Sequence, residues 1–293
     1  MAGFEDIQSD SNGLVSVANL APGNYELREV SAPVGYIVNT NPVPFTIEKE
    51  SAKEPHLNLG EFANYQGQVT LQKTNQQGHG LAGAVFQLWD VSAGGNGQLL
   101  RGAITSGEDG QVVVKDLAPG RYELRETSAP TGYIRNTAAI PFEIEAESKT
   151  APTHDLGTFV NFKGQATLTK TNEKGQPLSG ATFELWQVSG REATRIAEVV
   201  SDRNGHLQVA NLAPGTYEWR ETKAPTGYVR SSQVVRFTID EAAAKAPTLD
   251  LGKFENQPTT PYPHTGESNN PLWIMLGLTI IGGALLLLRK RRV

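Results

Sequence analysis

Apolar and polar residues alternate over short stretches through most of the chain. Tyr122-Glu-Leu-Arg-Glu126 and Phe86-Gln-Leu-Trp89 are two examples, each with a period of two residues. That period is typical of β-strands with one buried face, because successive side chains of a strand point to opposite sides of the sheet. Turn-forming pairs such as Asp109-Gly110 lie between apolar stretches, and short strands with a turn every 8–12 residues or so are typical of a β-sandwich. The pattern therefore predicts an all-β protein.

One unit of this pattern occurs three times. The segment Leu-Ala-Pro-Gly begins at Leu20, Leu117 and Leu212, so the copies are offset by 97 and 95 residues. Trp89 and Trp186 occupy equivalent strand positions, and we interpret them as core residues. A period of this length is too long for a solenoid repeat, so each copy is expected to have its own core. We call the three expected domains units 1, 2 and 3, and assign them to residues 1–67, 68–164 and 165–257.

Unit 1 is shorter than the other two. Its match to them starts near Ile7, so roughly 30 residues of units 2 and 3 have no counterpart in it. The first residues after Met1 show neither the basic nor the apolar region of a signal peptide. We expect from both observations that the sequence is a fragment of a longer protein or has a misassigned start.

Composition excludes several classes of function. The net charge is -5, and four of the 26 basic residues lie together at positions 289–292. Nucleic-acid binding is therefore disfavoured, because phosphate contacts need a basic face. None of the five histidines recurs beside a carboxylate, and no phosphate-binding loop or Gly-x-Ser-x-Gly element is present. We expect no metal, no cofactor and no enzymatic activity on an external substrate.

Polar residues recur on strand faces that should be buried. Lys73 lies on the same face as Val69 and Leu71, because the three are two residues apart. By the same spacing, Glu126 shares a face with Leu124, and Asn161 shares one with Phe159. Units 1 and 3 repeat the pattern, with 35 residues between glutamate and asparagine in every copy, at Lys170, Glu221 and Asn256 and at Glu29 and Asn64. An unpaired buried charge costs several kcal/mol, so the lysine and glutamate need a shared explanation.

The segments around these residues resemble a known family. Tyr122-Glu-Leu-Arg-Glu126-Thr-Ser-Ala-Pro-Thr-Gly-Tyr133 is similar to the glutamate-containing box of collagen-adhesin B-type domains (CnaB, or SpaA-like), and residues 217–228 fit equally well. Lys73-Thr-Asn followed by Leu81-Ala-Gly-Ala-Val-Phe86 resembles the opening of such a domain. The resemblance covers almost all of residues 7–256. It implies tandem Greek-key β-sandwich domains with a prealbumin-like fold.

The resemblance also implies a chemistry for the recurring residues. Such domains form an internal isopeptide bond between a lysine of the first strand and an asparagine of the last strand, assisted by the glutamate. Lys73 would attack Asn161 with the help of Glu126, and Lys170 would attack Asn256 with the help of Glu221. Glu29 and Asn64 have no matching lysine, so unit 1 should be unlinked. The alternative is a buried lysine–glutamate ion pair whose asparagine is only hydrogen-bonded.

The C-terminal region has three parts. A Pro/Thr-rich spacer at residues 258–271 contains Tyr262-Pro263-His264-Thr265-Gly266, an uncharged apolar stretch covers residues 272–288, and a basic tail follows at residues 289–293. The arrangement resembles the cell-wall sorting signal of Gram-positive bacteria, whose usual pentapeptide is Leu-Pro-x-Thr-Gly. It implies that one transmembrane helix holds the chain transiently, and that a sortase cleaves after Thr265 and joins it to a peptidoglycan precursor or to another pilin. A plain membrane anchor is the alternative.

These features favour a wall-anchored adhesin with a rigid stalk on the extracellular side of the cell wall. Two alternatives stay open. Tyr262 in place of leucine resembles variants of the signal in some pilus subunits, although no Tyr-Pro-Lys pilin motif is present, so a tip or basal subunit is expected rather than a shaft subunit. The chain could also be the stalk of an enzyme displayed on the surface. The host or matrix ligand cannot be identified from these residues.

Overall fold

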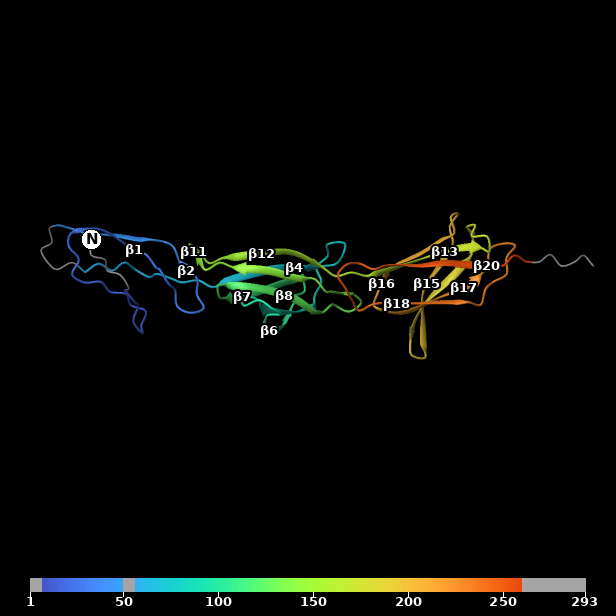
Figure 1. Ribbon diagram of the computed structural model, residues 1–293, viewed down its shortest axis with the longest axis horizontal. Coiled ribbons are helices and arrows are strands. Elements are labelled where there is room, and N and C mark those ends of the chain that lie inside the picture. Colours follow the sequence, from blue (N-terminus) through green and yellow to red (C-terminus); the bar gives the residue numbers. More distant parts are fainter. Residues whose placement is uncertain (1–6, 50–55, 260–293) are drawn as a thin grey trace, which may run out of the picture.

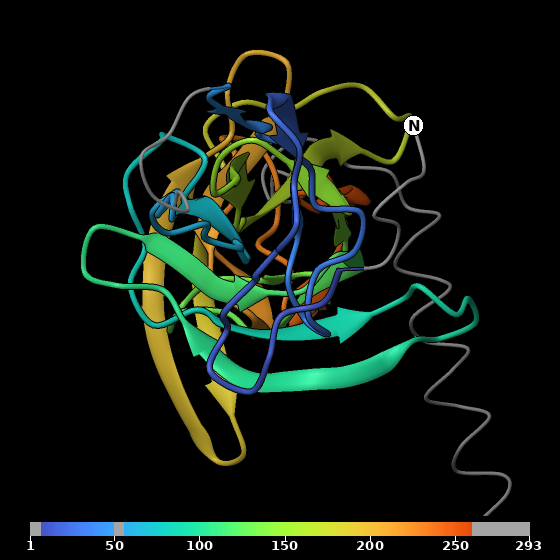
Figure 2. The same cartoon turned by 90° about the vertical axis from the view of Figure 1, so that its left-hand side faces the viewer.

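The computed structural model describes residues 7–49 and 56–259 of the chain. All regular elements in these two ranges are β-strands, as the alternating pattern predicted. Figure 1 shows three groups of strands that follow one another along the longest axis of the molecule. Viewed close to that axis, the groups lie one behind another, and the hairpin of β14 and β15 projects to the side (Figure 2). The repeats of the sequence are thus arranged in a row.

Unit 1 has little regular structure. Its strand β1 pairs antiparallel with β3, and Tyr25 on β1 stacks on Phe45 on β3 with 5.4 Å between the ring centroids. Only Ile37 and Asn39 are buried among the described residues up to Gln66. The strands of unit 1 are β1 (Gly23–Leu27), β2 (Val38–Asn39) and β3 (Val43–Ile47).

Unit 2 is a sandwich of two larger sheets. One sheet has the strand order β10-β8-β5-β6 and the other has the order β12-β4-β7. Its strands are β4 (Gly67–Thr74), β5 (Val85–Asp90), β6 (Gln98–Thr105), β7 (Gln111–Leu117), β8 (Gly120–Ser128), β9 (Arg135–Asn136), β10 (Ala139–Ile144), β11 (Glu147–Ser148) and β12 (Thr153–Val160).

Unit 3 repeats this topology. Its sheets have the orders β15-β14-β17-β18 and β16-β13-β20, which correspond strand for strand to those of unit 2. Its strands are β13 (Gly164–Asn172), β14 (Thr182–Ser189), β15 (Glu192–Val200), β16 (His206–Leu212), β17 (Gly215–Lys223), β18 (Val234–Ile239), β19 (Ala242–Ala243) and β20 (Thr248–Asn256).

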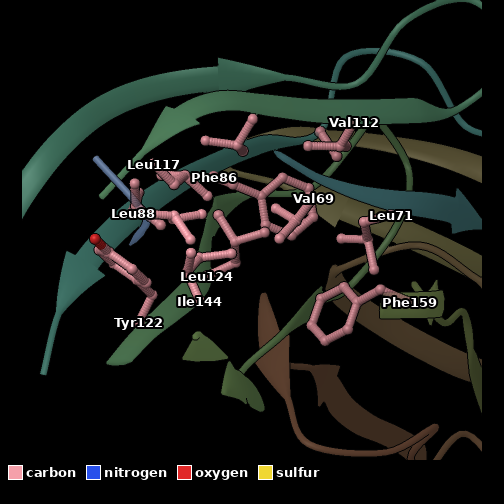
Figure 3. Packing of buried hydrophobic residues seen from close by; sticks show 13 residues of the cluster. Val69, Leu71, Phe86, Leu88, Val112, Leu117, Tyr122, Leu124, Ile144 and Phe159 are labelled. Atoms are coloured by element: carbon pink, nitrogen blue, oxygen red, sulfur yellow. The ribbon is translucent and has the colours of Figure 1, made fainter. Parts of the chain in front are cut away.

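Each sandwich has its own apolar core between the two sheets. In unit 2, Phe86 and Leu124 from one sheet face Val69 and Leu71 from the other, and Phe159 lies beside them (Figure 3). Every second residue of the central strands is buried, which is the period of two seen in the sequence. Full burial of one such side chain stabilises the fold by about 1.5–3 kcal/mol. The core therefore follows directly from the alternation.

The prediction for the two equivalent tryptophans was wrong. Trp89 and Trp186 are only partly buried, and each ring is covered by an arginine, with the guanidinium of Arg125 at 4.7 Å from the ring of Trp89 and that of Arg220 at 5.2 Å from the ring of Trp186. Successive side chains of a strand point to opposite faces of the sheet. Phe86 and Leu88 share the buried face, and Trp89 directly follows Leu88, so its side chain points to the outer face.

The first and last strands of each sandwich are parallel neighbours. Strand β4 pairs with β12 so that Lys73 lies beside Phe159, and β13 pairs with β20 so that Lys170 lies beside Phe254. The backbone N–H of Asn161 donates to the carbonyl of Thr74 at 2.9 Å and extends the first of these pairings. The chain thus enters and leaves each unit through adjacent strands.

Successive units are joined by a repeated β-bridge and a buried isoleucine. Strand β2 of unit 1 pairs in parallel with β11 of unit 2, and β9 of unit 2 pairs in parallel with β19 of unit 3. Ile37 of unit 1 is fully buried in the core cluster of unit 2, and Ile134 of unit 2 is fully buried in that of unit 3. Units 1 and 2 therefore each contribute a fully buried isoleucine to the core of the next unit, and each also packs a partly buried aromatic residue, Tyr65 or Phe162, against that core.

The predicted spacer beyond residue 259, the sorting pentapeptide and the apolar stretch 272–288 lie outside the described residues. Within residues 7–49 and 56–259, no helix is long and apolar enough to cross a membrane.

We predict that Gly110→Ala destabilises unit 2 far more than Gly132→Ala. Both glycines have a positive φ, of +84° and +82°, which costs an alanine about 1–2 kcal/mol. At Gly110 an added Cβ would also lie 2.2 Å from the carbonyl oxygen of Lys73, whereas at Gly132 it would meet no atom within 4 Å. Hydrogen exchange of unit 2 amides in the two variants would measure the difference. Equal loss of protection would show that the contact with Lys73 relaxes without cost.

Candidate functional site

The three polar residues predicted in unit 2 lie together between its two sheets. Lys73 is on β4, Glu126 is on β8 of the facing sheet, and Asn161 follows the end of β12. All three are buried, and the side chains of Lys73 and Glu126 have no exposed surface. The prediction that these residues occupy buried faces is therefore confirmed, and residues from three separate parts of the sequence meet at one point.

The glutamate is the centre of the cluster. Its Oε1 lies 4.0 Å from the Nζ of Lys73, and its Oε2 accepts hydrogen bonds from the side-chain Nδ2 of Asn161 and from the backbone N–H of Asn136, both at 2.7 Å. Asn161 Nδ2 also donates to the carbonyl of Ile134 at 2.9 Å. Both hydrogens of this amide group therefore have an acceptor, which defines the orientation of the amide plane.

The lysine is held from the other side by backbone carbonyls. Its Nζ donates to Phe159 at 2.9 Å and to Thr74 at 3.3 Å, and it lies 5.5 Å from the centre of the Phe159 ring. Glu126 Oε1 and Asn161 Oδ1 are buried without a hydrogen-bond partner among the described residues. Buried polar atoms without a partner are costly, so they need an explanation.

Burial shifts both ionisable groups of the cluster toward their neutral forms. Desolvation lowers the pKa of Lys73 to about 8, although the nearby Glu126 carboxylate acts against this. Desolvation also raises the pKa of Glu126, against the opposing effects of the hydrogen bonds from Asn161 and Asn136 and of the charge on Lys73. A neutral amine is a nucleophile, and a neutral carboxylic acid can donate a proton. The cluster therefore holds a potential nucleophile and a potential acid next to an amide.

Unit 3 contains the same cluster. Lys170 Nζ donates to the carbonyls of Phe254 at 2.8 Å and Thr171 at 3.0 Å, and burial lowers its pKa to about 8. Glu221 Oε2 accepts from Asn256 Nδ2 at 2.8 Å and from the backbone N–H of Ser231 at 2.7 Å. The structure thus brings together both predicted sets of three residues.

Unit 1 contains the glutamate and asparagine of the cluster. Glu29 Oε2 accepts from Asn64 Nδ2 and from the backbone N–H of Asn39, both at 2.7 Å, and Asn64 Nδ2 donates to the carbonyl of Ile37 at 3.0 Å. No ion pair joins Glu29 to a lysine among the residues described. The hydrogen bonds between glutamate and asparagine therefore form without the lysine.

Sequence reasoning missed the segment that supplies the remaining hydrogen bonds. Asn136 N–H and the Ile134 carbonyl hold Glu126 and Asn161, and the side chain of Asn136 donates to Val160 at 3.0 Å. A signal was present, since Ile37-Val-Asn-Thr40 in unit 1 recurs as Ile134-Arg-Asn-Thr137 in unit 2. In the part of the chain that the structure describes, no group of three or more histidine, aspartate or glutamate residues could hold a metal ion.

Comparison with known proteins identifies the family. A model of the SpaA prealbumin-like fold domain matches residues 2–58, 67–155 and 164–251, which together make up most of the chain. The chain belongs to the SpaA prealbumin-like family. Its three matched segments correspond to the three repeats, so the SpaA-like resemblance predicted from the sequence is confirmed.

Relatives of this SpaA-family chain include much longer proteins. Serine-aspartate repeat-containing protein D of Staphylococcus aureus (strain Newman) is 25% identical over 280 residues, covering 78% of this chain and 20% of that protein. Colossin-A of Dictyostelium discoideum is 25% identical over 247 residues, covering 72% of this chain and 2% of that protein. The chain therefore spans about a fifth or less of the length of these two relatives.

Solved structures with a similar chain include the Bacillus anthracis TIE protein and a streptococcal ancillary pilin. The first is 22% identical with a TM-score of 0.43, covering 86% of this chain and 45% of its own. The second is 22% identical with a TM-score of 0.30, covering 85% of this chain and 78% of its own. At these values the likeness carries no conclusion about function.

The SpaA-family segments are followed by a wall anchor. Residues 260–293 match a model of the LPXTG cell wall anchor motif. The protein is therefore anchored to the cell wall and lies on the extracellular side of a Gram-positive cell, as predicted. Tyr262, Pro263, His264, Thr265 and Gly266 all fall in this matched region, outside the described residues.

Proposed function

We propose that the chain is the stalk of a wall-anchored adhesin, in which units 2 and 3 each form an isopeptide bond between their own lysine and asparagine. The observation that supports this most is the recurrence of the buried cluster in two units. Lys73 Nζ lies 4.0 Å from Glu126, the charge of Glu221 acts on the pKa of Lys170, and each glutamate binds the amide of its asparagine. If one lysine were buried by chance, it would not be expected to occur again in a second unit with a glutamate and an asparagine at equivalent positions.

The proposed reaction is an amide exchange. The neutral Nζ of Lys73 attacks Cγ of Asn161, a bond between Nζ and Cγ forms, and the bond between Cγ and Nδ2 breaks. Glu126 transfers the proton lost by Nζ to the leaving Nδ2, which already donates a hydrogen bond to this carboxyl group at 2.7 Å. One ammonia leaves per bond, and no oxidant or cofactor is needed. Lys170, Glu221 and Asn256 have the same roles in unit 3.

Energetics favour the bond over a permanent ion pair. Two buried charges lose most of their solvation, and a buried ion pair is often no more stable than neutral groups in its place. The reaction removes the amine that is hardest to bury, and burial already moves the pKa of Lys73 and of Glu126 toward the neutral forms that it requires. The product is an uncharged amide in an apolar core.

The bond would join the strands through which an external pull acts on each unit. Because β4 and β12 are adjacent and parallel, a pull on the two ends of unit 2 acts on these strands in opposite directions. A bond between Lys73 and Asn161 would carry that force covalently and leave residues 74–160 outside the loaded path. On the chain-entropy model, closing a loop of roughly 90 residues also stabilises the fold by about 4–5 kcal/mol.

Sortase attachment completes the proposal. A sortase would cleave the chain after Thr265 and join the new carboxyl group to an amine of the peptidoglycan precursor. The match of residues 260–293 to the wall anchor motif supports this step. Units 2 and 3 would then be the part of the stalk nearest to the wall.

Mass spectrometry of the chain ending at Thr265 tests the bonds. We expect a mass lower than that of the sequence by two ammonias, since units 2 and 3 each lose one. Glu126→Ala and Glu221→Ala should each restore one ammonia, and the double variant should restore both. Glu29→Ala is the matched control, because unit 1 has the same glutamate but no lysine beside it, and it should leave the mass deficit unchanged. An unsubstituted chain with its full sequence mass would contradict the proposal and favour the buried ion pair.

The rate of bond formation should have a bell-shaped dependence on pH. The reactive pair must hold one proton, as neutral Lys73 and protonated Glu126, so the rate should rise with pH as the doubly protonated pair loses its first proton. It should fall again above about pH 8, where the pair loses the second proton. Chain refolded from urea at a series of pH values, with the ammonia loss followed by mass spectrometry, would show this. A rate that keeps rising well above pH 8 would mean that Glu126 supplies no proton.

A pilus subunit is the second candidate, favoured by Tyr262 in place of the leucine of the usual sorting pentapeptide. The two can be distinguished in wall extracts from a native or a heterologous Gram-positive host. A stalk joined to peptidoglycan should appear as one species after digestion of the wall, whereas a pilus subunit should appear in covalent multimers. Thr265→Ala should remove the chain from the wall fraction in both cases.

A further inference from the structure

The segment that follows β8 in unit 2 connects the site to the neighbouring unit. We call residues 134–137 the junction segment of unit 2, and the equivalent residues 37–40 and 229–232 those of units 1 and 3. In unit 2 this segment contains β9, which pairs with β19 of unit 3. Three of its residues, Ile134, Arg135 and Asn136, form hydrogen bonds with Glu126 or Asn161.

On the side of the site, the junction segment holds both reacting partners of the lysine. The Ile134 carbonyl accepts from Asn161 Nδ2 at 2.9 Å, and the Asn136 N–H donates to Glu126 Oε2 at 2.7 Å. The guanidinium of Arg135 donates to the backbone carbonyl of Glu126 at 3.1 Å. A displacement of this segment would therefore move the amide and the carboxyl group relative to Lys73.

On the opposite side, unit 3 holds the junction segment in place. Arg135 N–H donates to the carbonyl of Glu241 at 2.9 Å, and Thr137 N–H donates to that of Ala243 at 3.2 Å. The Ile134 side chain is 0% exposed within the core cluster of unit 3. Burial of this apolar side chain stabilises the contact between the two units. The position of the segment thus depends on a docked unit 3.

The hydrogen bonds of the asparagine amide differ between units that are followed by a docked unit and unit 3. Units 1 and 2 are each followed by a docked unit, and in both the asparagine amide donates to the glutamate and to the junction isoleucine carbonyl. In unit 3 the equivalent Val229 is 53% exposed, and among the described residues Asn256 Nδ2 donates to Glu221 alone. In unit 1 the hydrogen bond from the asparagine to the isoleucine carbonyl is present although the cluster has no lysine. This hydrogen bond is therefore found where a following unit is docked, whether or not the lysine is present.

We propose that docking of each unit positions the isopeptide site of the unit before it, and that Ile134 is the positioning residue that links unit 3 to the Lys73–Glu126–Asn161 site. The inference rests on the proposed isopeptide bond and adds an effect on its rate, so that unit 3, where Val229 is exposed among the described residues, would form its bond more slowly than unit 2. The covalent step is unchanged, since Nζ replaces Nδ2 on Cγ of Asn161 and ammonia leaves. Holding both amide hydrogens keeps the Cγ atom oriented toward the attacking amine, and loss of such orientation costs reaction rate.

The test compares two matched isoleucines in the whole chain. Ile134→Ala and Ile37→Ala each remove the same buried side chain from a junction, but Ile134 lies in the core cluster of unit 3 and Ile37 in that of unit 2. Each variant is refolded from urea, and peptide mapping follows the two cross-linked peptides separately. We expect Ile134→Ala to slow the Lys73–Asn161 bond by about tenfold or more, and Ile37→Ala to leave it within about twofold.

Ile134→Val keeps a branched side chain and should restore most of the rate, which also covers the case in which the alanine variant folds poorly. An unchanged Lys73–Asn161 rate in Ile134→Ala would overturn the inference while leaving the proposed function intact. So would the reverse pattern, in which each substitution slows only the bond of the unit whose core contains the isoleucine, because that is the result of core damage alone. Absence of both cross-linked peptides from the unsubstituted chain would overturn the proposed function, and this inference with it.

Discussion

Each complete unit depends on the burial of one lysine. Lys73 and Lys170 have no exposed surface, and each lies on the first strand of its sandwich beside the last. Burying a charged ammonium group in this position costs free energy, so the amine has to lose its proton, pair with an opposite charge or react to form an uncharged group. The facing glutamate, the asparagine at the end of the last strand and the backbone carbonyls around Nζ all lie around this amine. The parallel pairing of first and last strands is what brings them within reach.

Much of this arrangement could be predicted from the sequence. A period of two residues determines which side chains share a face, so Lys73 with Leu71 and Glu126 with Leu124 could be assigned to the interior before any coordinates. The same parity should have placed Trp89 on the outer face, and the error came from treating a large aromatic residue as core by its type. The repetition of the unit made the argument stronger, because a lysine, glutamate and asparagine that recur in register are difficult to explain separately.

The junctions could not be predicted in the same way. Ile134 is apolar and lies between β8 and β9 of unit 2, so the local pattern assigns it to the core of unit 2, whereas the structure places it in the core of unit 3. Strands β9 and β19 have two residues each, which is too short for a recognisable period. Periodicity reports that a side chain is buried, but it does not report against which partner. Contacts between separate domains are therefore the part of the structure that is hardest to predict from the sequence.

The two kinds of connection resist different forces. The proposed bond between the first and last strands would oppose extension of unit 2, because it would lie on the path that a pull must follow, while residues 74–160 would lie outside that path. Strand β9 lies among those residues, and β19 lies in unit 3 between Lys170 and Asn256, which the corresponding bond of unit 3 would bypass. The junction contacts between β9 and β19 would therefore oppose bending between units without being stretched by the pull. Because residues 134–137 take part in the junction and also hold the amide of the site, the proposed covalent closure of unit 2 would depend on the same segment that joins it to unit 3. A stalk built in this way would close each unit once its neighbour had folded against it.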